Sequence, residues 1–298
     1  MTEPRRLMLV HAHPDDEVTS TAITMAHHVG LGDRVTLVTC TLGEEGDIVV
    51  DDLKNLRSED PDALGRHRIG ELTEAMRVLG VTDFVRLGGD GKYRDSGMAV
   101  DEQGRVIPVP DATGNTFWSA DLTEAATDLA VLIRDRRPQV LITYDQYGSY
   151  GHPDHIQAHR VAMYGSQLAA VPSYRPDLGE AWAVPRMLWT AMAESGFREG
   201  LRRMQEAGRD WPWGDYDPAG PLPPMVTPDS AIAVEVFDPE RGEQKLQAFR
   251  AHASQIPTDF FLYQLSDTLG PGVLTRESYR FAGGVPVPKG AKDIFSGL

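Results

Sequence analysis

The sequence has a single cysteine and lacks long apolar runs. With Cys40 as the one thiol among 298 residues, an intramolecular disulfide and a multi-thiolate zinc site are both excluded. Any metal bound by this chain must therefore use nitrogen and oxygen ligands. No stretch of about 18 apolar residues is present, which argues against a membrane-spanning segment. The first residues also lack the apolar segment and cleavage site of a signal peptide, so we expect a cytoplasmic protein.

Basic side chains are scarce relative to acidic ones. The chain has 29 Lys and Arg against 44 Asp and Glu, which gives a formal net charge of −15 at pH 7. Such a charge repels phosphate backbones, so we expect no nucleic-acid partner. The remaining composition, 41% hydrophobic and 24% charged, is typical of a globular protein that can bury a substantial core. A homo-oligomer stays possible, because composition does not decide this question.

Short apolar runs alternate with amphipathic helical patterns in the first half of the chain. Buried strands are predicted at residues 6–13, 34–40, 83–87 and 139–143. Helices are predicted after Glu17, from Asp62, and after Asp121, which is a typical helix N-cap. This order predicts an α/β fold, namely a Rossmann-like, doubly wound and mostly parallel sheet.

The second half of the chain is less regular. Further elements are predicted at residues 186–192 and 231–237, with a final helix around 245–253. Long loop insertions are predicted at 41–60, 88–120 and 208–230, and loops of this length often bind or cover a ligand. We expect one domain over residues 1–298, with a Rossmann-like core at about 5–170 and a C-terminal elaboration at about 171–298.

Ionisable side chains are concentrated directly after the first predicted strand. Within seven residues the chain has His11, His13, Asp15, Asp16 and Glu17. Strand alternation places His11 and His13 on the same side, and Pro14 turns the chain so that Asp15 and Asp16 point in different directions. Ligands of such sheets bind beyond the carboxyl ends of the strands. One carboxylate of the Asp15-Asp16 pair can therefore coordinate a metal ion while the other stays uncoordinated.

A second polar cluster follows the strand at 139–143. It contains Tyr150, His152, Asp154 and His155, with Pro153 at an expected helix start. Together the two clusters offer two imidazoles and one carboxylate to a divalent ion and leave positions open, as catalytic zinc sites do. The same ligand set suits iron(II), so one divalent ion per chain is predicted, with Zn²⁺ as the first choice and Fe²⁺ as the alternative.

Five sequence blocks resemble the LmbE-like (PIG-L) family of metal-dependent deacetylases. They are AHPDDE at 12–17, TCTLGEEGD at 39–47, RIGEL at 68–72, RDSGM at 94–98 and YGHPDH at 150–155. The blocks lie in the first half of the chain, at the expected loops. The resemblance implies a hydrolase that removes the acetyl group of N-acetylglucosaminyl-inositol, a small amino-sugar substrate of mycothiol biosynthesis.

The resemblance also implies the roles of individual residues. The implied metal ligands are His13, Asp16 and His155. The implied catalytic residues are Asp15 as general base, His152 as general acid that titrates near neutrality, Tyr150 as oxyanion donor, and Asp154 as the partner that holds the His152 ring and favours its charged form. The implied substrate contacts are Arg68, Asp95 and Met98. Asp47 and the Lys92-Tyr93 pair depart from the family pattern, which affects the expected substrate fit more than the chemistry.

Several alternatives remain open. A related amidase acting on thiol conjugates of the same scaffold would be favoured by a lysine after AHPDDE, where this chain has Val18, Thr19 and Ser20. Another N-acetyl-sugar deacetylase is a second alternative, and an iron(II) oxygenase is a distant one, because such oxygenases usually have β-barrel folds. A non-catalytic sugar-binding protein would not need Asp15 beside the ligand Asp16. His11 is a rival metal ligand, although a supporting contact is favoured.

Overall fold

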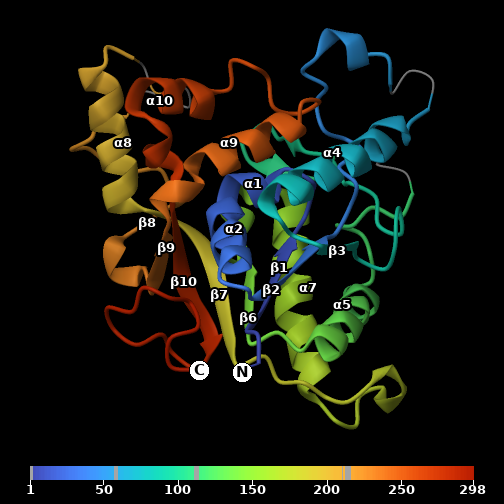
Figure 1. Cartoon of the computed structure of the whole chain (residues 1–298). Coiled ribbons are helices and arrows are strands. Elements are labelled where there is room, and N and C mark those ends of the chain that lie inside the picture. The colour runs from blue at the N-terminus through green and yellow to red at the C-terminus, as the bar shows by residue number, and fades with distance from the viewer. Residues whose placement is uncertain (1–2, 57–59, 111–113, 210, 212–215) are drawn as a thin grey trace.

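A central sheet of mostly parallel strands organises the fold (Figure 1). The computed structural model of the chain describes residues 3–56, 60–110, 114–209, 211 and 216–298. Along the sheet the strands are β3 (Asp83–Arg86), β2 (Arg34–Thr39), β1 (Arg6–His11), β6 (Val140–Thr143), β7 (Arg186–Ala193), β10 (Arg276–Gly284) and β9 (Val234–Phe237), and β8 (Val226–Thr227) pairs with the end of β7. The α/β fold predicted from the sequence is confirmed.

The strand directions place β1 at the middle of a parallel region. Strands β3, β2, β1, β6 and β7 run parallel, and Leu9 of β1 lies opposite both Leu37 of β2 and Ile142 of β6. Strand β10 is antiparallel to both β7 and β9. The carboxyl ends of β1 and β6 therefore lie side by side at one edge of the sheet.

Helices cover both faces of this sheet. The helices that share one apolar core are α1 (Asp16–Ser20), α2 (Ala22–Gly30), α4 (Ala63–Leu79) and α9 (Gly242–Ala251), and those that share the other are α5 (Leu122–Arg136) and α7 (Pro153–Ala170). Strand β1 contributes Leu7 and Leu9 to the first core and Met8 and Val10 to the second. Successive residues of a strand point to opposite faces of the sheet. A strand that is covered on both faces therefore has apolar residues at successive positions.

The remaining described elements are short or peripheral. They are α6 (Gly148–Gly151), α8 (Glu194–Glu206), α10 (Phe261–Leu269), the paired strands β4 (Ala99–Val100) and β5 (Val106–Ile107), and the 3₁₀ turns η1 (Asp51–Leu53), η2 (Pro176–Leu178), η3 (Asp229–Ala231), η4 (Pro239–Arg241) and η5 (Pro271–Leu274). All three long loops predicted from the sequence contain residues outside the described part of the chain. Within the described part, no helix combines the length and the apolar character that crossing a bilayer requires.

Two helix starts follow the predicted signals. The Asp121 side chain accepts a hydrogen bond from Glu124 N at 2.8 Å and caps α5. Pro153 is the first residue of α7, where a missing backbone N–H costs nothing. The predicted helix after Glu17 is instead broken at Thr21 (φ −142°), whose hydroxyl bonds the Glu17 carbonyl and the His11 ring.

The C-terminal part differs more from the prediction. Helix α9 was expected to be the last helix, but α10 follows it, and β10 was not predicted. Strand β10 was missed because Glu277 and Ser278 are polar yet buried, so they interrupt the apolar pattern. The predicted strand at 231–237 begins only at Val234, because the 3₁₀ turn η3, which ends at Ala231, precedes it.

The C-terminal strand anchors the helix that follows the first site loop. Glu277 of β10 accepts hydrogen bonds from Ile23 N (3.0 Å) and Thr24 N (2.8 Å) at the start of α2, and it pairs with Lys245 at 2.8 Å. Both charged side chains are at most 5% exposed. Because the two halves of the chain share this contact and one apolar core, we propose that residues 1–298 form a single domain, in which the part after about residue 170 completes the sheet.

We predict that Glu277→Gln destabilises the protein by about 3 kcal/mol, because it leaves the Lys245 charge buried without a counter-charge. Glu235→Gln on the neighbouring strand is the control. Glu235 pairs with a half-exposed Arg276, so its loss should cost less than about 1 kcal/mol. Urea unfolding at pH 7 measures both values. Equal losses for the two variants would contradict the anchoring role of Glu277.

Candidate metal and catalytic site

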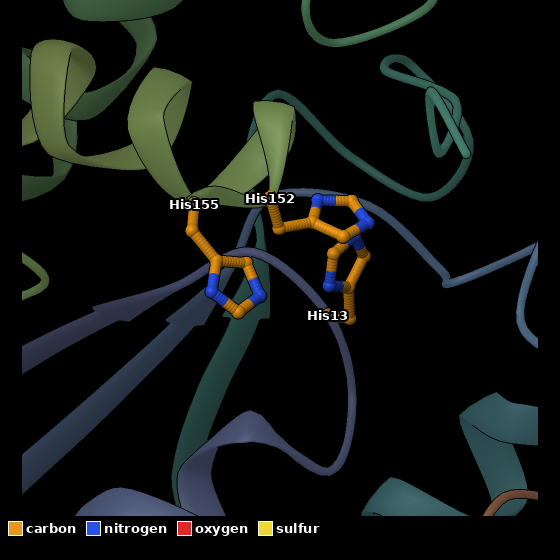
Figure 2. Close-up of side chains that lie close together, drawn as sticks. All are labelled: His13, His152 and His155. Atoms are coloured by element: carbon orange, nitrogen blue, oxygen red, sulfur yellow. The ribbon is translucent and has the colours of Figure 1, made fainter. Parts of the chain in front are cut away.

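The two polar clusters predicted from the sequence meet at the carboxyl edge of the sheet. Residues 12–15 leave the end of β1, and His152 stands at the N-cap of α7, which follows β6. Figure 2 shows the His13 ring from the first segment close to the His152 and His155 rings from the second. One ring nitrogen of each of these three buried histidines lies within 4.8 Å of the others. The predicted meeting of the two loops is therefore confirmed.

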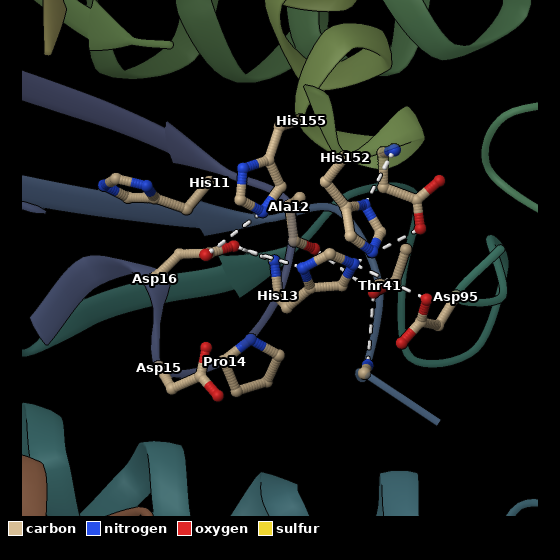
Figure 3. Close-up of polar contacts among 12 residues, drawn as sticks. His11, Ala12, His13, Pro14, Asp15, Asp16, Thr41, Asp95, His152 and His155 are labelled. Carbon is tan, nitrogen blue, oxygen red and sulfur yellow. Dashed lines mark hydrogen bonds and ion pairs between the residues drawn. The ribbon is translucent and has the colours of Figure 1, made fainter. Parts of the chain in front are cut away.

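The Asp16 carboxylate lies between two of these imidazoles (Figure 3). Its Oδ2 is 3.2 Å from His13 Nδ1, and its Oδ1 is 3.2 Å from His155 Nε2. Burial raises the pKa of Asp16, but the nearby His155 and His13 imidazoles outweigh burial and leave this pKa well below its usual value. Asp16 is therefore a carboxylate, as a metal ligand must be.

His155 shows that these residues fit a metal ion. Both of its ring nitrogens are buried without a hydrogen bond of acceptable geometry. A buried imidazole normally satisfies at least one nitrogen, so this one is suited to ligation. Two imidazoles and one carboxylate match the donor set of zinc and non-haem iron sites. His13, Asp16 and His155 would hold the ion, and the arrangement does not distinguish the two metals.

His13 is held from its far side by two carboxylates. Its Nε2 lies 3.3 Å from Asp154 Oδ2 and 3.6 Å from Asp95 Oδ1. An imidazole whose second nitrogen meets a carboxylate is fixed in orientation and becomes a better ligand. Burial raises the pKa of Asp95, but the His13 charge outweighs burial and holds this pKa well below its usual value.

The predicted pairing of the Asp154 carboxylate with the His152 ring is wrong. The Asp154 carboxylate is fully buried against His13 and Ser96, whose N–H and hydroxyl both donate to it. His152 instead receives a hydrogen bond from the Asp154 backbone N–H to its Nδ1, at 3.1 Å. The cause is local geometry: as N-cap, the His152 ring folds back onto the first turn of α7, while the Asp154 side chain points away from it.

This contact determines which ring nitrogen of neutral His152 carries the proton. A ring whose Nδ1 accepts an N–H bond carries its proton on Nε2 when neutral. Burial and the neighbouring charges of His13 and His155 lower the pKa of His152 to about 3. The expectation that His152 titrates near neutrality therefore does not match this structure, in which the ring is a neutral Nε2–H donor.

Asp15 stands beside the ligand set without joining it. Its backbone is left-handed (φ 95°, ψ −25°), which turns its side chain away from that of Asp16. Arg68, itself 2% exposed, donates from Nη2 to Asp15 Oδ2 at 2.8 Å and also bonds the Pro14 carbonyl. Gly43 permits this approach, because a Cβ at that position would collide with the guanidinium.

The environment of Asp15 suits proton transfer near neutral pH. Burial raises the pKa of Asp15 to about 6, against the lowering effect of the Arg68 charge. A carboxyl group with this pKa is mostly ionised at pH 7 and still a useful acid. Arg68 was predicted as a substrate contact, but in this structure its guanidinium holds Asp15 and the Gly43 carbonyl.

The other predicted site residues, Tyr150, Met98 and Asp95, differ in their exposure. Tyr150 is 48% exposed, with its ring 5.1 Å from that of His155. Burial of the hydroxyl and the charge of Asp16 raise the pKa of Tyr150, so the phenol keeps its proton and can donate a hydrogen bond. Met98 is also 48% exposed and is available to a bound molecule, whereas Asp95 is 5% exposed and accepts N–H bonds from Glu45 and Gly97.

Tyr144 is a functional-site residue that the sequence analysis missed. Its ring stacks on His155, with centroids 4.3 Å apart and an interplanar angle of 12°. Its hydroxyl accepts a hydrogen bond from Ala12 N at 3.0 Å and lies 3.2 Å from His11 Nδ1. His11 thus supports the site, as favoured from the sequence. The available signal was the position of Tyr144 directly after a strand that ends at the site edge.

A histidine from the C-terminal half was also missed. His252, at the end of α9, lies 2.7 Å from Glu17, and both side chains are fully buried. Burial lowers the pKa of His252, but the charge and hydrogen bond of Glu17 outweigh burial and leave this pKa above its ordinary value. No motif marks His252, because only folding brings it to the first loop.

Comparison with known proteins places the chain in a family of de-N-acetylases. The family described as PIG-L, GlcNAc-PI de-N-acetylase, matches residues 8–164, and the chain belongs to this family. A relative from Kribbella flavida, named 1D-myo-inositol 2-acetamido-2-deoxy-alpha-D-glucopyranoside deacetylase, is 50% identical over 297 residues, which are 99% of this chain and 98% of the relative. The family resemblance seen in the sequence is therefore confirmed.

Solved structures share the fold at low sequence identity. N,N'-diacetylchitobiose deacetylase from Pyrococcus horikoshii superposes with a TM-score of 0.59 at 18% identity, covering 94% of this chain and 84% of that one. GalB, a 4-carboxy-2-hydroxymuconate hydratase from Pseudomonas putida, gives a TM-score of 0.60 at 15% identity, covering 96% and 100%. Because one fold carries two activities, the site residues must decide the chemistry.

We predict that His155→Ala and Asp16→Asn each weaken zinc binding more than about 100-fold, because each removes one of three protein ligands. His152→Ala should weaken it less than about 10-fold. His159→Ala is the matched control on the same helix, since its Nδ1 already bonds the Tyr144 carbonyl. Competition with a chromogenic chelator measures the affinities. A loss in His152→Ala as large as in His155→Ala would instead make His152 a ligand.

Proposed function

We propose that this protein hydrolyses the acetamide of N-acetylglucosaminyl-inositol and releases acetate and glucosaminyl-inositol. The close relative in which almost the whole chain aligns bears the name of this deacetylase. The observation that carries the chemical assignment is Asp15, a carboxylate with a pKa of about 6 that stands beside the ligand set and pairs with Arg68 rather than with a ligand imidazole. A site that only binds a sugar would not need such a group.

We further propose Zn²⁺ as the metal, with Fe²⁺ as the alternative, and the cytoplasm as the location. The three ligands suit both ions, and the lone buried cysteine is compatible with a reducing compartment. When bound at His13, Asp16 and His155, the ion would supply Lewis acidity, which lowers the pKa of water to about 7 and polarises a carbonyl group.

Asp15 acts as the general base in this proposal. It accepts a proton from the attacking water, and its raised pKa matches this task at neutral pH. Arg68 supports the base in two ways, because it fixes the carboxylate by a 2.8 Å hydrogen bond and keeps the pKa of Asp15 from rising further. Water attack on the carbonyl carbon then gives a tetrahedral oxyanion.

Tyr150 and His152 are suited to stabilise that oxyanion. The Tyr150 phenol keeps its proton, and the neutral His152 ring presents an Nε2–H fixed by the Asp154 backbone bond. Preorganised donors of this kind stabilise the charge that develops in the transition state.

The leaving amine needs a proton before the C–N bond breaks. The family resemblance implies His152 for this step, but a neutral ring with a pKa of about 3 is a poor proton donor to an amine. Asp15 carries the proton taken from water and, with a pKa of about 6, can deliver it to the nitrogen. We therefore propose Asp15 as base and then acid, with His152 as the oxyanion donor.

The proposed role of each predicted substrate-binding residue depends on how exposed its side chain is. Met98 is exposed and follows Asp95 by three residues, and it is proposed to contact the sugar or the inositol ring. Arg68 and Asp95 are proposed to shape the site through Asp15 and His13. The thiol-conjugate amidase remains the second candidate function, because the same residues would serve it. A small-molecule substrate also fits the net charge of −15, which disfavours a nucleic-acid partner.

We expect the protein as purified to release acetate from N-acetylglucosaminyl-inositol, with turnover lost on complete chelation and restored by Zn²⁺ or Fe²⁺. Acetate quantification on matched samples gives the result, and a mycothiol S-conjugate serves as the competing substrate. Full turnover after metal removal would reject the mechanism. Faster cleavage of the conjugate would favour the amidase.

Arg68→Ala should lower kcat and move the acidic limb of the pH profile to higher pH. The sign follows from Asp15: its carboxylate must be ionised to act, and removing the cation that lowers its pKa keeps it protonated to higher pH. Arg68→Lys should shift the limb less. A raised KM with an unmoved acidic limb would instead make Arg68 a plain substrate contact.

A further inference from the structure

A fully buried histidine–glutamate pair lies behind the base and has no role in the chemistry described so far. His252 Nε2 is 2.7 Å from Glu17 Oε1, and both side chains are 0% exposed. The two residues are 235 positions apart in the chain. Burying such a pair carries a desolvation cost, so its presence beside the site calls for a function.

Glu17 connects this pair to the base. While Oε1 meets His252, Oε2 accepts a hydrogen bond from the Asp15 backbone N–H at 2.8 Å. The three groups therefore form one hydrogen-bonded row, from the His252 ring through the Glu17 carboxylate to the Asp15 peptide. Each Glu17 oxygen has a distinct partner in this row.

The backbone of Asp15 needs such a contact to keep its conformation. Its φ of 95° lies in the left-handed region, which an aspartate adopts at a cost and keeps only where the surroundings fix it. Arg68 holds the far end of the residue, the carboxylate, and Glu17 holds the near end, the N–H. Without the second contact the backbone can relax and redirect the carboxylate.

The far end of the row is itself rigid. His252 lies where α9 ends, and its carbonyl accepts N–H bonds from Gln255 (3.1 Å) and Ile256 (2.9 Å). Two residues on, Ser254 donates from its N and its hydroxyl to Glu71 of α4, each at 2.7 Å. The backbone that carries the His252 ring is therefore held in the fold independently of the loop that carries Asp15.

We propose that His252 is a positioning residue of the hydrolysis: through Glu17 it fixes the Asp15 peptide in its left-handed conformation and so aims the base at the attacking water. This inference rests on the proposed function, since it takes Asp15 to be the base. It assigns to the C-terminal half of the chain a part in catalysis that no motif in the sequence marks.

The first test compares His252→Ala with His252→Gln, whose amide N–H can replace the Nε2 donor. For His252→Ala we expect kcat to fall about 10- to 100-fold, as for a misplaced catalytic group, while KM and zinc content stay within about twofold. His252→Gln should recover most of the activity. The His252→Ala/Glu17→Gln double variant removes the charge that His252→Ala leaves unpaired, and it should show the same fall in kcat.

His28→Ala is the matched control. His28 is another buried histidine paired with a carboxylate, Asp33, at 2.8 Å, but it lies at the far end of α2. Its loss should lower the melting temperature and leave kcat unchanged. A fall in kcat for His28→Ala equal to that for His252→Ala would make the effect one of general stability and overturn the proposal.

The second test places His252→Ala in an Asp15→Ala background. If His252 acts only by aiming the base, its loss has no further effect once the base is gone. A further fall of tenfold or more would overturn the proposal, as would normal turnover in His252→Ala alone. A wild-type protein that releases no acetate overturns the proposed function as well, so the two failures are distinguishable.

Discussion

The site depends on one juxtaposition, in which the Asp16 carboxylate lies 3.2 Å from imidazoles of two segments that are far apart in the sequence. This contact exists because β1 and β6 are neighbouring parallel strands, whose carboxyl ends release their loops at the same edge of the sheet. Several buried carboxylates and imidazoles then share one small volume. Their mutual pairing offsets the cost of removing each from water, and a divalent ion fits the remaining unsatisfied nitrogens of His155.

The same loop must also keep a second carboxylate out of the ligand set. The left-handed backbone at Asp15 turns its side chain toward Arg68, while Asp16 faces the imidazoles. Gly43 makes room for the guanidinium. Ligand and base are therefore separated by the conformation of one residue, and the surrounding hydrogen bonds maintain it.

Residues of the C-terminal half stabilise the segment that carries Asp15 and Asp16. Glu277 of β10 binds the first turn of α2, Lys245 of α9 neutralises Glu277, and His252 contacts Glu17. These contacts act on α1 and α2, the short helices that follow the site loop directly (Figure 1). A loop that carries ligands and a base needs such support, because catalytic geometry is sensitive to small displacements.

The sequence alone determined the α/β fold, the parallel strands of the first half, the helix starts marked by Asp121 and Pro153, and the two polar clusters around His13 and His155. These features follow from local pattern: apolar runs of strand length, helical periodicity, and the rule that polar residues after parallel strands share one edge. Only the tertiary structure decided which side chains pair within the site. In the structure the Asp154 carboxylate pairs with His13 and not with His152, and Arg68 pairs with Asp15. Tyr144 stacks on the ligand His155, and His252 pairs with Glu17. Such pairings depend on side-chain directions and on contacts over as many as 235 residues, which no local pattern encodes.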